Sequence, residues 1–414
     1  MPIQSPHICI VGGGFGGLYT ALYLQKYRHL QHAQITLIEP NGRFLFTPMM
    51  YELITGELKE WEIAPTYSSL ITGTNIDWQQ SRAEALDLKQ RTVTLTDRQK
   101  LSYDYLVVAT GAESRPVDIP GVDKHALTFR TFEDSQQLKA RLAQLVQART
   151  LSSTGVSTQP IRVTIVGGGA SGVELAGKVA DYLGPQSKIT LVERGPALLK
   201  NFSHGLRKQA YRAMRQRQVE ILTETSVATV GADSIKLQQN GQLQEVQSDL
   251  TLWAVGTRPR PWLGEQAIDQ NDYGQRLTRR SLQLPNYDNV FVLGDVADVR
   301  GRSQKTAPNT AQAAFQAADR VAANLAAMTR GKSPKPFNYL HLGDMITLGV
   351  GDAGLSSFGI TIGGKLAALC RRGVYVFRMP TQRHQLRVGR RALAELAYAV
   401  FLPWRKRRAQ RSPY

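Results

Sequence analysis

The stretch TIVGGGASGVE at residues 164–174 decides the fold of this chain, because it closely repeats CIVGGGFGGLY at residues 9–19. Each copy begins as an apolar strand pattern and continues into a turn of the form GxGxxG. The helical patterns LYTALYLQKY, from residue 18, and VELAGKVADYL, from residue 173, follow these turns. The glycines of the two turns are Gly12, Gly14 and Gly17 in the first copy and Gly167, Gly169 and Gly172 in the second.

A further strand pattern follows each of these helices and ends in an acid. Glu39 stands 22 residues after Gly17, and Glu193 stands 21 residues after Gly172. This is the spacing of the dinucleotide fingerprint, in which the acid accepts hydrogen bonds from a ribose and the start of the helix attracts a pyrophosphate. The alternative is a pair of glycine turns that bind nothing. The sequence predicts an α/β chain with two Rossmann-type units, each of which binds a dinucleotide.

Three later strand patterns end in residues suited to the same ligands. YDYLVVATGAESRP, from residue 103, delivers Thr110 and Gly111, and LTLWAVGTRPRP, from residue 250, delivers Gly256. NVFVLGDVADV, from residue 289, contains Gly294 and Asp295, and an acid there can bind sugar hydroxyls. Two dinucleotide sites in one chain indicate electron transfer between a tightly held flavin dinucleotide and a visiting nicotinamide nucleotide.

The composition narrows the class of protein. The chain has 414 residues, of which 42% are hydrophobic and 20% charged, as in a globular protein of two or three domains. It shows neither a signal-peptide pattern nor an apolar run close to the ~18 residues of a membrane span, so we expect it to be neither secreted nor transmembrane. Cys9 and Cys370 form no CxxC pair and the seven histidines lack ligand spacing, so we expect no metal site.

With these fingerprints the chain resembles the flavin-linked pyridine-nucleotide oxidoreductases, in which one Rossmann-type domain is inserted into another. The resemblance implies an FAD-binding domain at residues 1–155 and 285–335, an NAD(P)H-binding domain at 156–284 and a membrane-association region at 336–414. The Ser/Thr/Gly-rich stretch 149–160 is the expected linker. The residues implied for FAD are Gly12, Gly14, Gly17, Glu39, Thr47, Pro48, Thr110, Gly111, Gly294 and Asp295, and those implied for NAD(P)H are Gly167, Gly169, Gly172, Glu193, Arg194 and Gly256.

The absence of a cysteine pair limits the classes of electron acceptor that the chain can use. Residues 44–58 read FLFTPMMYELITGEL, without the cysteines that the disulfide reductases of that superfamily carry there, so thiol exchange is excluded. In KTAPNTAQAAFQAADRVAANL, from residue 305, the pattern AQxAxQ places Gln312 and Gln316 one helical turn apart on one face. A glutamine pair on a solvated helix face is one interpretation of this pattern.

These stretches resemble the type II NAD(P)H:quinone oxidoreductases. The resemblance is greatest to the cyanobacterial and plastid members that reduce prenylated naphthoquinones, including demethylphylloquinone, or plastoquinone. It implies that Gln312 and Gln316 line a quinone pocket near the flavin. Substrate choice rests on this resemblance.

Glu174, two residues past the last glycine of the second turn, has two interpretations. It is a carboxylate in the first helical turn, favoured by the helix dipole by roughly 0.3–1 kcal/mol. Alternatively, as the family's GVE pattern implies, it lies beside the flavin and the nicotinamide and relays protons to the quinone, for which a partly buried carboxylate with a raised pKa is suited. We expect Glu174, Gln312 and Gln316 to be the catalytic residues.

The sequence leaves the choice of nucleotide open. Glu193 pairs well with a free 2′-hydroxyl and repels a 2′-phosphate, which favours NADH. Arg194 follows directly and can bridge a 2′-phosphate, and the subgroup that the chain resembles is associated with NADPH. The expected cosubstrate is therefore NADH or NADPH, together NAD(P)H.

Basic charge gathers at the carboxy-terminal end. Residues 365–414 hold thirteen Lys or Arg residues and one Glu, a net +12 of the chain's +18. From residue 388, VGRRALAELAYAVFLPWRKRRAQR spaces Leu393, Leu396, Val400 and Trp404 as one helical stripe beside Phe401, and Pro403 is expected to end the helix before Trp404. Such a stripe flanked by arginines suits a helix in a membrane interface, with RKRR drawn to anionic headgroups. A solvated tail and nucleic-acid binding are the alternatives, and the second lacks a base-reading motif.

The expected activity is hydride transfer from NAD(P)H to FAD, followed by reduction of a membrane quinone with two electrons and two protons. We expect a peripheral protein on the cytoplasmic side of a membrane, the thylakoid or plasma membrane if the source is cyanobacterial, and no nucleic-acid partner. The resemblance also makes a homodimer one expected state of the protein. Two alternatives remain: a reductase of a small electron-carrier protein, which would dock through basic charge, and a flavin-bearing sensor or scaffold on a membrane surface.

Overall fold

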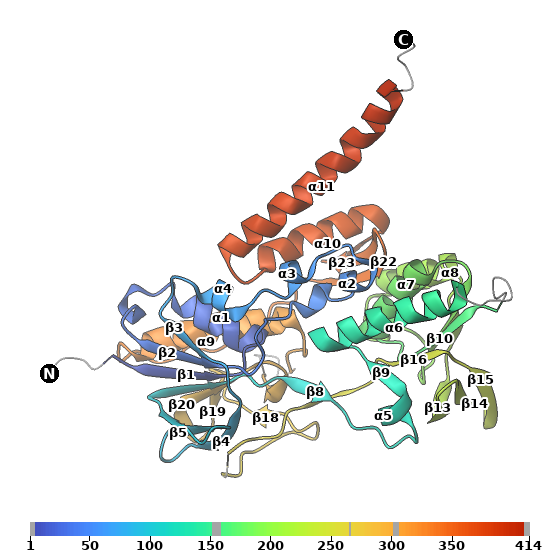
Figure 1. The fold of residues 1–414 in the computed structure, drawn as a ribbon. Coiled ribbons are helices and arrows are strands. Elements are labelled where there is room, and N and C mark those ends of the chain that lie inside the picture. Colours follow the sequence, from blue (N-terminus) through green and yellow to red (C-terminus); the bar gives the residue numbers. More distant parts are fainter. Residues whose placement is uncertain (1–4, 151–158, 265, 301–305, 410–414) are drawn as a thin grey trace.

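Two sheets made mostly of parallel strands form the centre of the molecule (Figure 1). The computed structural model describes residues 5–150, 159–264, 266–300 and 306–409. The first sheet has the order β19 (Gln283–Leu284), β20 (Tyr287–Val292), β7 (Tyr105–Val108), β1 (His7–Val11), β2 (Gln34–Ile38) and β3 (Ile76–Gln79), with β19 antiparallel to β20. The second has the order β12 (Glu220–Leu222), β11 (Ser187–Val192), β10 (Ile161–Val166), β16 (Leu250–Trp253) and β9 (Ala126–Thr128), all parallel.

Helices cover these sheets because the central strands are apolar on both faces. In β1, Ile8, Cys9 and Ile10 are completely buried. Helices α1 (Phe15–Leu24) and α9 (Ala311–Met328) pack on each other beside the first sheet, while α6 (Phe132–Thr150), α7 (Ala170–Leu183) and α8 (His204–Gln216) belong to the second unit. Each GxGxxG turn joins a central strand to the next helix, β1 to α1 and β10 to α7. The predicted α/β class with two Rossmann-type units is confirmed.

The chain crosses between the two units earlier than the sequence predicts. Strand β9 pairs with β16, and Leu138 and Leu142 of α6 lie in the second core, although all three precede residue 155. On the return, Leu282 and β19 already belong to the first core and sheet before residue 285. The boundaries at 155 and 285 are therefore wrong. A three-residue edge strand carries no periodic signal in the sequence.

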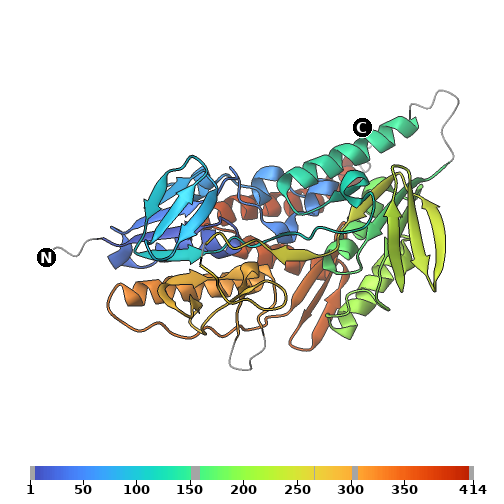
Figure 2. The ribbon, with the colours of Figure 1, turned by 90° about the horizontal axis from the view of Figure 1, so that it is seen from below.

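A two-stranded antiparallel ribbon makes the crossing between the units. It consists of β8 (Ala112–Ser114) and β17 (Thr257–Pro259). Of the expected linker at 149–160, residues 151–158 lie outside the described residues. Figure 2 shows the first unit, blue and orange, beside the second, green and yellow.

Small sheets and short helices complete the two units. The strands are β4 (Ala83–Asp87), β5 (Thr92–Leu95) and β6 (Lys100–Ser102), then β13 (Thr225–Val230), β14 (Ser234–Gln239) and β15 (Gln242–Gln247), and the pair β18 (Arg276–Leu277) and β21 (Ala297–Asp298). The short helices are α2 (Glu52–Thr55), α3 (Glu60–Ile63), α4 (Tyr67–Ile71) and α5 (Val122–His125).

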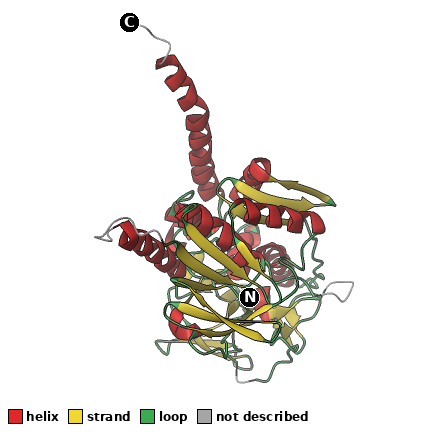
Figure 3. Ribbon diagram, turned by 90° about the vertical axis from the view of Figure 1, so that its right-hand side faces the viewer, coloured by secondary structure: helices red, strands yellow, loops and turns green. Residues whose placement is uncertain are grey.

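The carboxy-terminal region adds an antiparallel sheet and two helices. Strands β22 (Asp344–Gly349), β23 (Asp352–Ser357) and β24 (Ile360–Gly363) precede α10 (Gly364–Arg378) and α11 (Gln382–Ala409). Strand β22 packs on α7, so this region joins the second unit to the rest. Figures 1 and 3 show α11 projecting from the body of the molecule. Among the helices in the described ranges, none is both long and apolar enough to cross a bilayer.

The structure corrects one expectation about α11. The helix continues through Pro403 to Ala409, so the predicted end before Trp404 is wrong. A proline removes one backbone hydrogen bond and crowds the preceding turn, and here the turns on either side keep the helix continuous. Of the predicted apolar stripe, Leu393 is exposed, whereas the side chains of Leu396, Val400, Phe401 and Trp404 lie outside the described residues.

Candidate active site

A cleft of about 1160 Å³ opens at the carboxyl ends of the first sheet's strands. Parallel strands deliver their ends to one edge, which is where ligands bind in folds of this class. Residues predicted for FAD line it: Gly12, Gly14, Glu39, Thr47, Thr110, Gly111, Gly294 and Asp295. Gly17 and Pro48 do not line the cleft. Gly17 packs α1 against the Gly12 turn, and the Pro48 carbonyl accepts a hydrogen bond from Arg371.

The first glycine turn has the geometry of a phosphate cradle. Gly12 has a φ of 99°, and a Cβ there would stand 2.4 Å from the Ala109 carbonyl oxygen. A Cβ on Gly17 would stand 1.8 Å from the Gly12 carbonyl oxygen. A Cβ on Gly14 would meet no described atom within 4 Å, so Gly14 opens to the cleft. The start of α1 is therefore free to approach a pyrophosphate.

Glu39 lies beside this cradle. Its Oε2 atom accepts the Gly13 N–H at 2.8 Å, and its Oε1 atom accepts the Asn41 N–H at 2.9 Å. The Tyr67 hydroxyl donates to the Gly13 carbonyl at 2.8 Å. The Asn41 side-chain amide also donates to Oε1, at 2.6 Å, so Oε2 is the oxygen that keeps a lone pair for a ribose hydroxyl. The cleft and its residues thus fit FAD.

Sequence reasoning missed four arginines that line the same cleft: Arg43, Arg82, Arg130 and Arg260. Burial raises the pKa of Asp295, and the Arg130 guanidinium partly offsets that rise. These arginines come from separate loops and share no motif. The sequence therefore contains no pattern that would group them into one site. Arginines in such a cleft suit a pyrophosphate.

The second glycine turn repeats the first. Gly167 has a φ of 115°, and a Cβ on Gly172 would stand 1.8 Å from the Gly167 carbonyl oxygen. A Cβ on Gly169 would meet no described atom within 4 Å. Gly256, with a φ of 74°, follows β16 beside this turn. The second unit therefore offers a cradle like that of Gly14.

Glu193 repeats the bonds of Glu39. Its Oε2 atom accepts the Gly168 N–H and its Oε1 atom accepts the Gly195 N–H, both at 2.6 Å. These amides fix the carboxylate where a ribose hydroxyl would meet it. Arg194 is exposed beside it.

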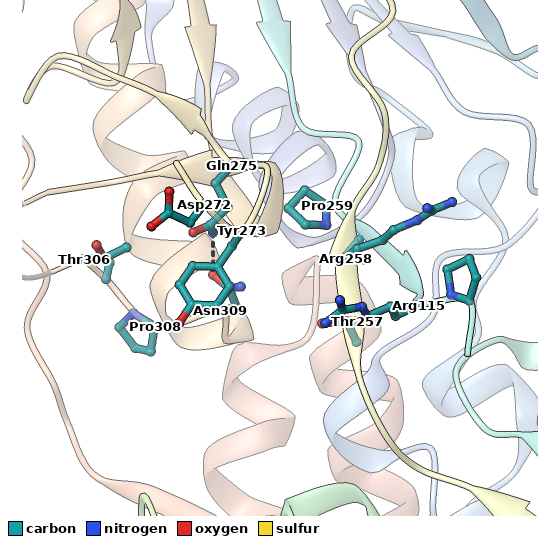
Figure 4. A pocket seen from close by; sticks show the side chains of 13 residues that line it. Arg115, Thr257, Arg258, Pro259, Asp272, Tyr273, Gln275, Thr306, Pro308 and Asn309 are labelled. Atoms are coloured by element: carbon teal, nitrogen blue, oxygen red, sulfur yellow. Dashed lines mark hydrogen bonds between the residues drawn. The ribbon is translucent and has the colours of Figure 1, made fainter. Parts of the chain in front are cut away.

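A second cavity of about 660 Å³ borders the cleft at the interdomain ribbon (Figure 4). It shares Ala112 and Asn309 with the cleft lining. Arg115 and Arg258 lie on one wall, and Tyr273 faces them from the other. This cavity therefore adjoins the cleft and reaches Thr257, the residue after Gly256.

Glu174 is buried, with 7% of its surface exposed. It lies beyond the first turn of α7, which carries no acid, so the interpretation of Glu174 as a first-turn carboxylate is wrong. Its Oε1 atom accepts the Thr347 N–H of β22 at 2.9 Å and lies 3.7 Å from Arg371 Nη2. Burial raises the pKa of Glu174 to about 7, against the opposing effects of Arg371 and the Thr347 amide.

Glu174 belongs to a buried charge cluster from α2, α7 and α10. Arg371 forms an ion pair with Glu52. Lys178 is 1% exposed, forms an ion pair with Glu57 and lies 4.0 Å from Glu52. Opposite charges compensate one another here, because an unpaired buried charge is very costly. The members stand far apart in the sequence, so no local pattern predicts the cluster.

Gln312 and Gln316 do share one face of α9, as predicted, and that face is half-buried and not a free solvated surface. Residues 339–343, here called the glutamine strap, cover it. Gln312 Oε1 accepts the Tyr339 hydroxyl at 2.7 Å and the Leu342 N–H at 3.0 Å. Gln316 makes two bonds with the Leu340 backbone, at 2.8 and 2.9 Å.

Strand β22 brings the two groups of candidate catalytic residues together. The glutamine strap leads directly into β22, and Thr347 of this strand binds Glu174. Ala311 and Ala314, on the same helix as the glutamines, line the cleft. Glu174 therefore contacts β22 and the two glutamines contact the strap that precedes it, while none of the three is among the described residues that line the cleft.

The carboxy-terminal arginines are not all free for an external partner. Arg371 is buried in the charge cluster, Arg372 pairs with Glu395, and Arg391 pairs with Glu395 and with the buried Glu62. Part of the basic charge at residues 365–414 is therefore neutralised within the molecule. Among the described side chains of these two helices, six large apolar ones are exposed, namely Leu366, Leu369, Val374 and Phe377 of α10 and Leu386 and Leu393 of α11.

Comparisons with known proteins agree with this geometry. Residues 6–318 match the family model described as pyridine nucleotide-disulphide oxidoreductase. A demethylphylloquinone reductase of Synechocystis sp. is 40% identical over 94% of this chain and 96% of its own length. An alternative NAD(P)H-ubiquinone oxidoreductase of Arabidopsis thaliana is 33% identical over 93% of this chain and 80% of its own length.

Solved structures share the fold at low identity. NDH2 of Plasmodium falciparum in complex with NADH has a TM-score of 0.83 at 18% identity, covering 92% of this chain and 96% of that one. A sulfide:quinone oxidoreductase of Aquifex aeolicus has a TM-score of 0.73 at 23% identity, covering 89% of each chain. The family match and the two relatives show that the chain belongs to the pyridine nucleotide-disulphide oxidoreductase family, among the type II NAD(P)H:quinone oxidoreductases.

Proposed function

We propose that the protein is an FAD-dependent NAD(P)H:quinone oxidoreductase that does not pump protons. The observation that carries this proposal is the presence of two dinucleotide cradles in one chain, the first opening to the cleft and the second at the start of α7, the helix that carries Glu174. Gln312 and Gln316 lie on α9, whose Ala311 and Ala314 line the cleft. The described residues that line the cleft include no cysteine. Cys9 is buried, which raises the pKa of its thiol to about 12, so it offers no thiolate.

Each part of the site has a proposed task. Bound FAD accepts a hydride and passes two electrons on. Glu39 holds the adenosine ribose, the start of α1 holds the pyrophosphate, and Asp295 binds hydroxyls of the sugar-alcohol chain. In the second unit, Gly169 and Glu193 hold the visiting nucleotide. The cavity at the ribbon, with Arg115 on its wall, leads this nucleotide to the cleft.

Glu174 is proposed to relay protons. With a pKa of about 7, both of its protonation states are populated near neutral pH, which a relay requires. Arg371, 3.7 Å away, stabilises the ionised form, while the Thr347 amide fixes the carboxylate. Gln312 and Gln316 are proposed to shape the quinone side.

The acceptor is proposed to be a prenylated naphthoquinone such as demethylphylloquinone, or plastoquinone. The 40% identity to a demethylphylloquinone reductase supports the first. A prenyl tail places the substrate in a bilayer, and the exposed apolar residues of α10 and α11 beside basic charge suit an anionic membrane surface. We place the protein on the cytoplasmic face of a thylakoid or plasma membrane, as a homodimer if the carboxy-terminal regions pair.

Steady-state assays with NADH or NADPH test this function. A prenylated naphthoquinone in liposomes should sustain oxidation of one or both nucleotides, and comparison of the two rates settles the nucleotide. Glu174→Gln should keep FAD but slow quinol formation. Salt-sensitive activity with a ferredoxin and none with quinones would instead identify a reductase of a carrier protein. A bound flavin that neither NADH nor NADPH reduces would favour the alternative of a flavin-bearing sensor or scaffold on a membrane surface.

A further inference from the structure

A backbone amide fixes the orientation of the Gln312 side chain. The Leu342 N–H donates to Gln312 Oε1 at 3.0 Å, so this atom is the carbonyl oxygen. The Tyr339 hydroxyl lies 2.7 Å from the same atom. A carbonyl has no proton to give, so Tyr339 is the donor in this bond. The single hydroxyl proton of Tyr339 therefore points toward α9.

This assignment fixes the proton on the neighbouring imidazole. His341 Nδ1 lies 3.2 Å from the Tyr339 oxygen. Because Tyr339 gives its proton to Gln312, Nδ1 must carry the proton that joins the ring to Tyr339. The other ring nitrogen, Nε2, lies 3.6 Å from the Asp344 carboxylate. Asp344, His341, Tyr339 and Gln312 thus form a row in which the two fixed donors point inward.

The row joins water to the wall of the cleft. At its outer end, the side chains of His341 and Asp344 are 56% and 32% exposed. At its inner end, the Tyr339 hydroxyl also contacts the Thr310 side chain, and Thr310 and Ala311 line the cleft. A proton can therefore travel from solvent to the start of α9 along groups already in place.

The proposed reaction needs one such path. Its balance is NAD(P)H plus quinone plus one proton giving NAD(P)⁺ plus quinol. The nucleotide gives up a hydride, which carries two electrons and one hydrogen. The second hydrogen of the quinol must come from solvent as a proton, once per turnover.

We propose that His341 and Tyr339 are the proton inlet of this site, an inference that rests on the proposed function. His341 takes a proton from water on Nε2, its Nδ1–H bond breaks, and that proton forms a new O–H bond on Tyr339. The former hydroxyl proton of Tyr339 leaves for the quinone oxygen, which takes the place of Gln312 Oε1 as acceptor. The exposed ring then exchanges protons with water, losing the proton on Nε2 and gaining one on Nδ1, which restores the starting tautomer.

The surroundings of His341 suit this role. The titratable groups that face it are Tyr339 on the strap and Asp344 at the start of β22. From α9, the uncharged side chains of Gln312 and Gln316 contact the strap. From β23, the Ser357 hydroxyl donates to the Leu342 carbonyl at 2.7 Å. Glu174 is not part of this row; it is buried and accepts the Thr347 N–H of β22.

The kinetic test separates the two half-reactions in the FAD-loaded protein. Reduction by NAD(P)H should be unchanged in His341→Gln and Tyr339→Phe. Reoxidation by a naphthoquinone should slow by about tenfold or more in both, and the wild-type pH dependence of this step should flatten in His341→Gln. Imidazole should restore part of the rate in His341→Ala. His32→Gln, at an exposed histidine of the first unit, is the matched control.

A second measurement does not use activity. Nitrogen-15 spectra of labelled histidines should show the neutral His341 ring with its proton on Nδ1, and Tyr339→Phe should shift it toward Nε2. An Nε2–H ring in the wild type would overturn the inlet. Wild-type reoxidation rates in both variants, or a loss confined to Tyr339→Phe, would also overturn it. A wild-type protein that no quinone reoxidises would instead refute the proposed function, whatever the tautomer.

Discussion

At the residue scale, Gly14 and Gly169 stand at matching places in the two cradles, and a Cβ on either meets no described atom within 4 Å. Alanine should therefore fold at both positions but occupy the space that a pyrophosphate needs. We expect Gly14→Ala to be purified nearly free of FAD. Gly169→Ala should keep FAD and show a KM for NAD(P)H roughly tenfold higher, equivalent to ~1.4 kcal/mol of binding.

Flavin absorbance of the purified variants and steady-state kinetics measure these two effects. Gly17→Ala is the contrasting control, because its Cβ would stand 1.8 Å from the Gly12 carbonyl oxygen and should impair folding itself. If Gly169→Ala lost FAD while Gly14→Ala retained it, the assignment of the two cradles would be reversed.

Glu174 gives a prediction about stability and pH. Burial raises its pKa from 4.5 to about 7, so between these values the native state holds a proton that the unfolded state has released. The contribution of Glu174 to the free energy of unfolding is therefore present below pH 4.5 and lost as the pH rises to about 7. Relative to Glu174→Gln, the wild type should lose stability across this window and stay level above it.

Urea denaturation of both proteins at several pH values measures this difference. A free-energy difference that stays constant from acid to neutral pH would show that the Glu174 pKa is not raised in the folded protein.

At the element scale, Arg371 joins α10 to α2 and α7 through Glu52 and Glu174. Arg371→Met removes the cation of Glu174 and the nearer of the two cations beside Glu52, and should lower the free energy of unfolding by about 3–5 kcal/mol. Adding Glu52→Gln to that variant should recover part of the loss, because one uncompensated charge is removed. Urea denaturation measures both changes.

Lys365→Met, at an exposed cation of the same helix, is the control and should change stability by less than about 0.5 kcal/mol. Equal losses in Arg371→Met and Lys365→Met would mean that the charge cluster contributes nothing specific to the packing of α10.

Helix α11 is proposed to carry the membrane contact. Replacing Arg405, Arg407 and Arg408 with Gln should weaken binding to anionic liposomes by roughly a hundredfold, since each basic residue near the surface contributes ~1 kcal/mol. Activity with a short-chain, water-soluble quinone should stay unchanged. Liposome sedimentation and steady-state assays check the two results.

The matched control replaces three exposed cations of α8, Lys208, Arg212 and Arg215, with Gln. This variant has the same net charge, so an equal loss of liposome binding would assign the effect to overall charge and not to α11.

At the scale of the whole molecule, sequence spacing predicted what is local. The two cradles, Glu39 and Glu193 follow from short motifs within one strand–turn–helix unit, and in the structure each carboxylate accepts an N–H of its own glycine turn. Contacts between distant segments had no such signal. Arg371 meets Glu52 across 319 residues, and the glutamine strap meets Gln316 across 24 residues with a backbone that carries no motif. The early domain crossing at β9 was missed for the same reason.

The central claim is that one cleft passes electrons from a nicotinamide nucleotide to a quinone. The most direct measurement is anaerobic: purified protein is mixed with NADH or NADPH, then with a prenylated naphthoquinone, with and without anionic liposomes, while flavin absorbance is followed. The account predicts bleaching by the nucleotide and recovery by the quinone, faster on liposomes. Bleaching with no recovery for any quinone, or no bleaching at all, would contradict it.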